Sequence, residues 1–431
     1  MRFHWVAAKS QLTAYTTRLV THWLTKHGAK EVDAADATVI LCTCSSVREL
    51  STLRRARKLA DKLRVPLVAG GHAAYAGASL LAWADYVCVG EGYHLLADAA
   101  GRGASWRGAF DEAPNVLSKA DPLREVVPDY RVPWGRLPAI QLDKHNFYAL
   151  AGRGCRRKCS FCMTSWVQPW QSEDPRWVRK MQAAAKRSIK GGGGIYFVTN
   201  DDGLGTQAGS TTLKRFLAVE RDDWPMVIRC GIEGLTAERR RAFKKPIADE
   251  DIAAAILKSR RINRVLQLFY IVGFPDDPPD EEAFLPLAEC LPTETVRQPW
   301  VYLKFTYFEP NPHTPMARWD VSQLRPFEPY VAAAALMRQS GRFRVFKAGH
   351  PGKRLWNAIA FRCGPDTIDE WLSARSRVDK MPVADACALA EKIAGRGVVD
   401  GTGDFPWTRV RCSVSKRALD PSFAPPRSQW A

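Results

Sequence analysis

Residues 152–162 read GRGCRRKCSFC and place three cysteines on one short segment, Cys155, Cys159 and Cys162. Three and then two residues separate them, a spacing that lets one loop wrap around a metal centre. Three thiolates on a [4Fe-4S] cluster leave one iron without a protein ligand, open to a cofactor or substrate. A zinc site needs a fourth Cys or His, and the nearest candidates, His145 and Cys230, lack zinc-knuckle spacing. The loop therefore favours a cluster, with zinc and metal-free core thiols as the alternatives.

This loop resembles the CxxxCxxC loop of the radical S-adenosylmethionine (SAM) superfamily. The resemblance implies that SAM chelates the open iron and that an electron from the cluster cleaves it to methionine and a 5′-deoxyadenosyl radical. Phe161 matches the aromatic residue that commonly precedes the third cysteine in this family, near the adenine. The resemblance also implies a reducing partner such as flavodoxin or ferredoxin.

Four further segments resemble radical SAM strand ends and follow one another in the family's order. The resemblance places three kinds of contact to SAM: a polar strand end, an acidic strand end and a Gly-x-Pro turn beside the adenosine; the residues are Asn200, Asp201, Asp202, Glu233, Gly273 and Pro275. Residues 308–316, FEPNPHTPM, resemble the proline-rich segment that closes the barrel in cobalamin-type members. The resemblance covers residues 142–320 and predicts a partial (β/α)6 TIM-like barrel, with its chemistry at the strand carboxyl ends.

Ahead of this barrel, residues 1–100 alternate between expected strands and helices. Strands are expected at 1–8, 38–42, 65–69 and 86–89, with helices at 11–27 and 45–63. This α/β pattern predicts a doubly wound, Rossmann-like sheet whose ligand crevice lies beyond the strand carboxyl ends. Five prolines interrupt residues 101–141, which we interpret as a linker.

Residues 68–73 and 85–92, VAGGHA and DYVCVGEG, resemble cobalamin-binding domains fused to radical SAM barrels. Such domains can use an Asp-x-His-x-x-Gly ligand motif, but residues 8–11 read AKSQ at that position. Two interpretations stay open: the domain binds cobalamin without a histidine ligand, or it serves substrate binding. His72 is a candidate contact to a corrinoid or substrate, or else a loop histidine satisfied by backbone. Residues 40–54 also resemble tRNA methylthiotransferases, but Cys44 alone falls where their second cluster needs a cysteine, so we expect one cluster.

The chain carries 63 basic and 45 acidic residues, a net charge of +18. Residues 338–362 hold seven cations and no acid, interleaved with aromatic residues. Cations bind phosphates and aromatic rings stack on bases, so we predict a basic substrate region at 321–431. Its candidate substrate contacts are Arg342, Arg344, Lys347 and Trp356. The alternative is a solvated basic face.

A length of 431 residues indicates two or three domains. No stretch approaches the ~20 apolar residues of a membrane span, and the amino terminus lacks the apolar run of a secretion signal. We therefore expect a cytoplasmic protein without membrane contact, in which the 11 cysteines are thiols or metal ligands.

The predicted function is a radical SAM enzyme that modifies a base, or a group attached to a base, in DNA or RNA. The alternative is a cobalamin-dependent radical SAM methyltransferase or rearrangement enzyme that acts on a small metabolite, with an incidental positive surface. A nucleic-acid-binding protein with a structural cluster is a third hypothesis, which the open iron disfavours.

Overall fold

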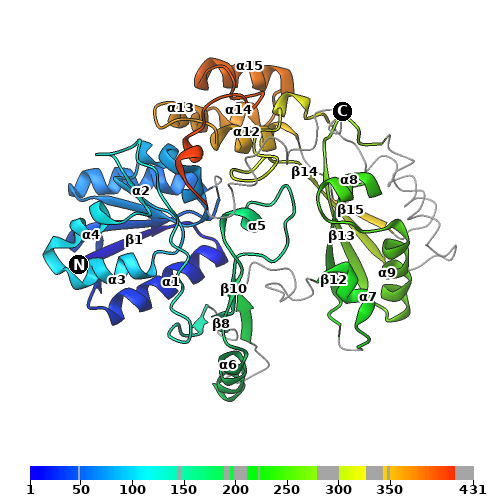
Figure 1. The fold of residues 1–431 in the computed structure, drawn as a ribbon, viewed down its shortest axis with the longest axis horizontal. Helices are drawn as coiled ribbons and strands as arrows, with labels where there is room; N and C mark the ends of the chain where they lie inside the picture. The colour runs from blue at the N-terminus through cyan, green and yellow to red at the C-terminus, as the bar shows by residue number, and fades with distance from the viewer. Residues whose placement is uncertain are drawn as a thin grey trace.

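The computed structural model describes residues 1–46, 49–142, 147–188, 195–198, 211–221, 224–278, 300–326, 343–346 and 350–412. Its first domain is a six-stranded sheet in the order β2-β1-β3-β4-β5-β6, parallel except for β6 (Figure 1). The strands are β1 (Arg2–Ala7), β2 (Lys30–Glu31), β3 (Val39–Thr43), β4 (Leu67–Gly70), β5 (Tyr86–Cys88) and β6 (Val116–Ser118). Since β2 and β3 lie on opposite sides of β1, the strand order reverses between β1 and β3 and opens a ligand crevice there.

Helices cover both faces of this sheet because alternate residues of its strands are apolar on both sides. Val39 and Leu41 of β3 pack toward α1 and α3, whereas Ile40 and Cys42 pack toward α2. Ser10 caps α1 by accepting a hydrogen bond from the Thr13 amide. The helices are α1 (Gln11–Lys26), α2 (Leu50–Leu63), α3 (Tyr93–Gly101) and α4 (Trp106–Glu112), with 3-10 turns η1 (Ala34–Asp36), η3 (His72–Ala82) and η4 (Gly103–Ser105).

The segment interpreted as a linker, residues 101–141, is more ordered than we expected. It contains α4 and β6, and β6 extends the first sheet by pairing antiparallel to β5. Its prolines limit the length of each element, but the stretches between them are long enough for a short helix and a short strand. The proposed domain boundaries themselves stay predictions.

Among the described residues of the second region, parallel strands form parts of two sheets. In one sheet β8 (Phe147–Leu150) pairs parallel with β11 (Ile195–Val198) and antiparallel with β7 (Ile140–Gln141). In the other, β12 (Val227–Glu233), β13 (Val265–Val272), β14 (Val301–Tyr307) and β15 (Phe343–Phe346) are parallel neighbours. The accompanying elements are α5 (Thr164–Val167), α6 (Pro175–Ser188), α7 (Leu213–Ala218), α8 (Ala237–Ala242), α9 (Asp249–Arg261) and the short pair β9 (Gly152–Arg153) and β10 (Gln171–Ser172).

The carboxyl-terminal helices pack above the other two regions in Figure 1 and share a hydrophobic core with them. They are α12 (Gly352–Ala360), α13 (Ile368–Ser373), α14 (Arg375–Val378) and α15 (Val383–Ala394), with 3-10 turns η5 (Val321–Gln323) and η6 (Pro406–Arg409). Trp356 of α12 is 2% exposed; its indole donates a hydrogen bond to the Trp371 carbonyl, and the Trp371 indole donates one to the Trp356 carbonyl. Our prediction that Trp356 contacts a nucleic-acid base is therefore corrected, because this ring is part of the core.

Helices that are both long and apolar enough to cross a membrane are absent from the described parts of the chain.

Candidate functional site

The cluster loop, residues 154–162, begins directly after β9 and ends before α5. Gly154 enters the loop with a φ of +73°, and a Cβ there would lie 2.3 Å from the Pro169 carbonyl oxygen, so glycine is required. Cys155 and Cys159 are buried and Cys162 is half-buried.

Three neighbouring segments hold this loop in place. The Ser160 hydroxyl donates to the Ala242 carbonyl over 3.0 Å, and the Ser160 amide donates to the Phe243 carbonyl over 3.2 Å. The Trp166 indole donates to the Cys159 carbonyl over 2.8 Å, and the Asn311 amide to the Phe161 carbonyl over 3.4 Å. Contacts from these three segments therefore support the loop.

The donor set of the loop fits an iron–sulfur cluster. The Arg157 amide donates to the Cys155 sulfur over 3.4 Å, a bond of the kind that stabilises cluster thiolates. Burial raises the pKa of Cys159 to about 12, nearby Lys245 lowers it, and Cys162 raises it further. Within the described residues no three His, Cys, Asp or Glu side chains converge to hold a single ion. Three thiolates on one loop suit a four-iron cluster, in which each thiolate binds a different iron.

An aromatic row leads from the cluster loop to the turn that follows β13. Phe161 packs against Phe243 at 5.1 Å between ring centroids, and Phe243 packs against Phe274 at 5.6 Å. Gly273 has a φ of +101°, and a Cβ on it would lie 2.5 Å from the Tyr307 ring. The half-buried Pro275 follows in the same turn. The structure thus brings Phe161 and the Gly273–Pro275 turn, both predicted from sequence, to the two ends of one apolar wall.

Asp277 shapes this turn, and the sequence argument gave it no role. Its carboxylate accepts hydrogen bonds from the amides of Gly273 and Phe274, at 2.6 and 2.9 Å. Burial raises the pKa of Asp277 to about 6, although the two backbone hydrogen bonds lower it. Residues 273–277, GFPDD, contain a signal for this role, since Asp commonly accepts hydrogen bonds from nearby turn amides.

Glu233 ends β12 with a φ of +78° and forms an ion pair that the sequence did not reveal. Lys245 Nζ lies 2.7 Å from Glu233 Oε1, and the side chains of Lys245 and Glu233 are 7% and 16% exposed. Both charges act on Cys159, so the pair lies close to the cluster loop. The predicted contact between Glu233 and SAM therefore involves a carboxylate that already carries a lysine partner.

The remaining predicted site residues are more widely spread. Asn200, Asp201, Asp202, Arg342 and Lys347 lie outside the described residues. Arg344 lies exposed on β15, with its guanidinium over the rings of Tyr302 and Phe346.

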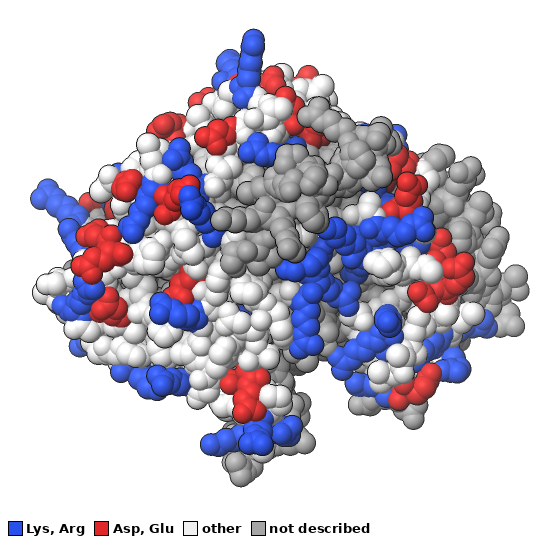
Figure 2. Space-filling model, in the orientation of Figure 1, with Lys and Arg blue, Asp and Glu red and all other residues white. Residues whose placement is uncertain are grey.

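Two cations of the predicted basic substrate region, which we expected to line a track for phosphates, contact other parts of the protein instead. Arg362 is 4% exposed and donates to four backbone carbonyls, and Arg354 pairs with Glu309 at 2.7 Å. Figure 2 shows basic side chains gathered instead over the face between α5 and the β12–β15 sheet. Exposed cations beside the cluster loop include Arg156, Lys158 and Lys244.

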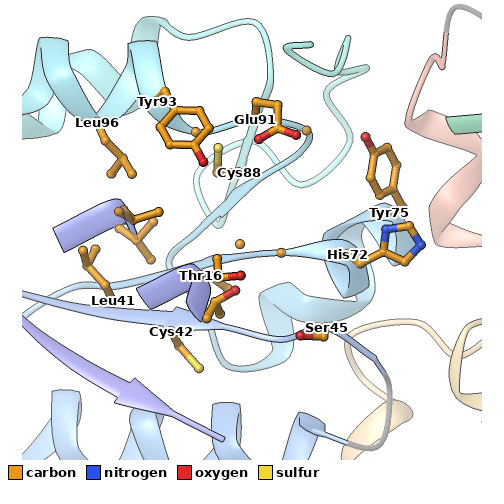
Figure 3. A pocket seen from close by; sticks show the side chains of 18 of the residues that line it. Thr16, Leu41, Cys42, Ser45, His72, Tyr75, Cys88, Glu91, Tyr93 and Leu96 are labelled. Carbon is orange, nitrogen blue, oxygen red and sulfur yellow. The ribbon is translucent and has the colours of Figure 1, made fainter. Parts of the chain in front are cut away.

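The first domain contains a cavity of about 310 Å³ at the carboxyl ends of its strands (Figure 3). Apolar side chains from the sheet and from α1 and α3 line its inner part, among them Val20, Leu41, Val68 and Leu96. Polar groups line the end toward the barrel: Thr43, Ser45, His72, Tyr75, Glu91, Arg153 and Gln168. The cavity lies at the predicted crevice of the doubly wound sheet.

Arg153 connects this cavity to the cluster loop. It is the last residue of β9, directly before the loop, yet its guanidinium lies in the cavity wall with Nε 2.9 Å from Glu91 Oε1. Gln168 donates to the same carboxylate oxygen over 2.8 Å. Arg153 and Glu91 were in the quoted motifs, but nothing in the sequence paired them.

Comparisons with known proteins identify solved structures with a similar architecture. No family model and no curated protein matches the chain. A structure of the radical SAM methyltransferase TsrM from Kitasatospora setae, with cobalamin and a [4Fe-4S] cluster bound, has a TM-score of 0.53 at 12% identity, over 90% of this chain and 99% of that chain. A second structure of TsrM, with tryptophan substrate and the SAM analog aza-SAM bound, has a TM-score of 0.52 at 13% identity. This match covers 74% of this chain and 76% of that chain.

Similarity at this level of identity concerns the fold. The predicted fold class, a Rossmann-like domain followed by a radical SAM barrel, is confirmed. The chain shares its fold with TsrM, a radical SAM methyltransferase whose structure holds cobalamin and a [4Fe-4S] cluster.

Proposed function

We propose that this chain is a cobalamin-dependent radical SAM enzyme that methylates a small molecule. The observation that carries the proposal is the position of Arg153, which joins the cluster loop to the wall of the cavity in the first domain. The similar TsrM structures hold cobalamin and a cluster, and a SAM analog with the small substrate tryptophan. One reaction that uses cobalamin, the cluster and SAM would need their sites next to each other, and Arg153 supports this for the cluster loop and the cavity.

The residues present fit these groups. The three loop cysteines would hold the cluster, and Phe161 with the Gly273 turn would flank the adenosine of SAM. The cavity offers a corrinoid both an apolar interior and polar groups, including the buried Tyr75 hydroxyl, which has no hydrogen-bond partner among the described residues. Buried polar groups are normally satisfied, so such a hydroxyl facing a cavity indicates a ligand contact.

When bound, the cluster, SAM and a corrinoid would together supply the methyl-transfer chemistry, in which SAM and a substrate C–H give C–CH3, S-adenosylhomocysteine and a proton. The protein's part is to position these bound groups and to exclude water from them. The Arg153–Glu91 ion pair fixes the cluster loop against the cavity. The row Phe161, Phe243 and Phe274 keeps one wall of the barrel site apolar.

The small-molecule alternative fits the structure better than the nucleic-acid hypothesis. Some cations of the carboxyl-terminal segment already bind Glu309 or backbone carbonyls, and Trp356 is buried. A continuous track for phosphates therefore has fewer free cations than the charge count suggested.

The test is anaerobic reconstitution of the full chain with iron, sulfide and cobalamin, followed by incubation with SAM. We expect about four irons per chain, because one loop of three cysteines holds one cluster. S-adenosylhomocysteine without 5′-deoxyadenosine indicates polar methyl transfer. Formation of 5′-deoxyadenosine indicates radical chemistry, which needs one electron per SAM cleaved from a donor such as reduced flavodoxin or ferredoxin. Failure to bind cobalamin would contradict the proposal.

A further inference from the structure

His72 occupies a position that follows from the turn after β4. Gly71 has a φ of +91°, and a Cβ on it would lie 2.6 Å from the Cys44 carbonyl oxygen, so the chain turns tightly against the end of β3. The turn places His72 in the cavity lining, at the strand ends beside the reversal of strand order between β1 and β3. Figure 3 shows its imidazole next to Tyr75, outside the apolar part that contains Leu41 and Leu96.

The ring nitrogens of His72 are free to bind a ligand. None of the described residues makes a hydrogen bond with the ring, which contacts Tyr75 edge-on at 5.7 Å between centroids. Burial, and then the positive charge of Arg153, lower the pKa of His72 to about 4. The imidazole is therefore neutral at physiological pH, the form that coordinates metals.

We propose that His72 supplies the axial nitrogen ligand to the cobalt of a corrinoid bound at this cavity. This inference rests on the proposed function. His72 is the one histidine among the described residues that line the cavity. Residues 8–11, where the familiar ligand motif would lie after the first strand, contain no histidine. The ligand would thus come from the end of β4, two strands away in the sheet from β1.

The experiment uses the full chain produced with ¹⁵N-labelled histidine and loaded with unlabelled cob(II)alamin. Electron paramagnetic resonance reports the axial nitrogen, because ¹⁵N splits each cobalt line into a doublet whereas ¹⁴N from the corrinoid's own base splits it into a triplet. We expect the doublet in the unchanged protein. His72→Gln should lose it while still binding cobalamin, and His94→Gln, a change at an exposed residue of α3, should keep it.

Each outcome decides between the two proposals. Bound cob(II)alamin with a triplet, or with no nitrogen splitting, overturns the role of His72 and leaves the proposed function intact. A doublet that persists in His72→Gln also overturns it, since another histidine would then be the ligand. Absence of bound cobalamin in the unchanged, folded protein overturns both proposals.

Discussion

Protonation of His313 should destabilise the folded protein in mildly acidic solution. His313 follows β14, is 0% exposed and packs between Tyr75 and Trp407. Its Nε2 lies 3.0 Å from the Tyr75 carbonyl oxygen, so in the neutral ring Nε2 carries the proton. Nδ1 is buried without a hydrogen-bond partner among the described residues, and a proton added there would be unsatisfied.

The size of the effect follows from the pKa of His313, which burial lowers to about 4 in the folded protein. An unfolded histidine titrates near ~6.5, so the unfolded chain binds the proton first as pH falls. The contribution of the neutral ring is fully present above pH ~6.5 and is lost progressively down to pH ~4. Between pH 7 and pH 5 this loss is about 2 kcal/mol, and it approaches about 3 kcal/mol below pH 4.

The assay compares thermal unfolding of the unchanged protein and His313→Gln at pH 7 and at pH 5. Gln keeps an amide donor for the Tyr75 carbonyl but does not titrate. The variant should therefore lose about 2 °C less in Tm than the unchanged protein between these two pH values. His94→Gln should behave like the unchanged protein. Equal losses in His313→Gln and in the unchanged protein would refute a buried neutral imidazole at this position.

Three further predictions concern the cluster loop, its neighbouring ion pair and the carboxyl-terminal core. Cys159→Ala should abolish the cluster absorbance of the reconstituted protein, whereas Cys88→Ala in the first domain should keep it. Cluster absorbance that persists in Cys159→Ala would exclude a three-cysteine cluster. Lys245→Met should lower stability by about 3–5 kcal/mol because it leaves the Glu233 carboxylate buried and unpaired, and adding Glu233→Gln should restore part of this loss in thermal unfolding. Trp356→Ala should cost about 3–5 kcal/mol by opening a cavity, and a variant of unchanged Tm would show that the ring is not in the core.

The cluster loop was predictable because its information is local. Three cysteines within one short loop predict a metal site without knowledge of any other segment. The alternation of strands and helices in residues 1–100 is local in the same sense, since each buried strand and amphipathic helix shows its own periodicity. Both predictions describe elements, and neither needed the pairing of residues distant in the chain.

The partners of charged residues could not be predicted, because they come from distant segments. Arg153 of the second region pairs with Glu91 of the first domain. Lys245 pairs with Glu233, which lies on the other side of helix α8 in the chain. Counting charge also failed to separate exposed cations from buried ones. Arg362 counted toward a phosphate track, yet its guanidinium satisfies carbonyls at 2.6 to 3.0 Å inside the protein.

The buried contacts around η3 explain why the cavity in the first domain depends on the rest of the chain. η3 begins at His72, and its Gly77 lies so close to the Pro406 carbonyl that a Cβ would approach it to 2.5 Å. Tyr75 of η3 contacts His313, which in turn contacts Trp407 of η6. The barrel's closing segment and the carboxyl-terminal turn therefore hold the element that carries His72 and Tyr75 into the cavity. Because Arg153 and Gln168 also line the polar end of the cavity, the first domain and the second region form it together, and the carboxyl-terminal turn supports it through η3.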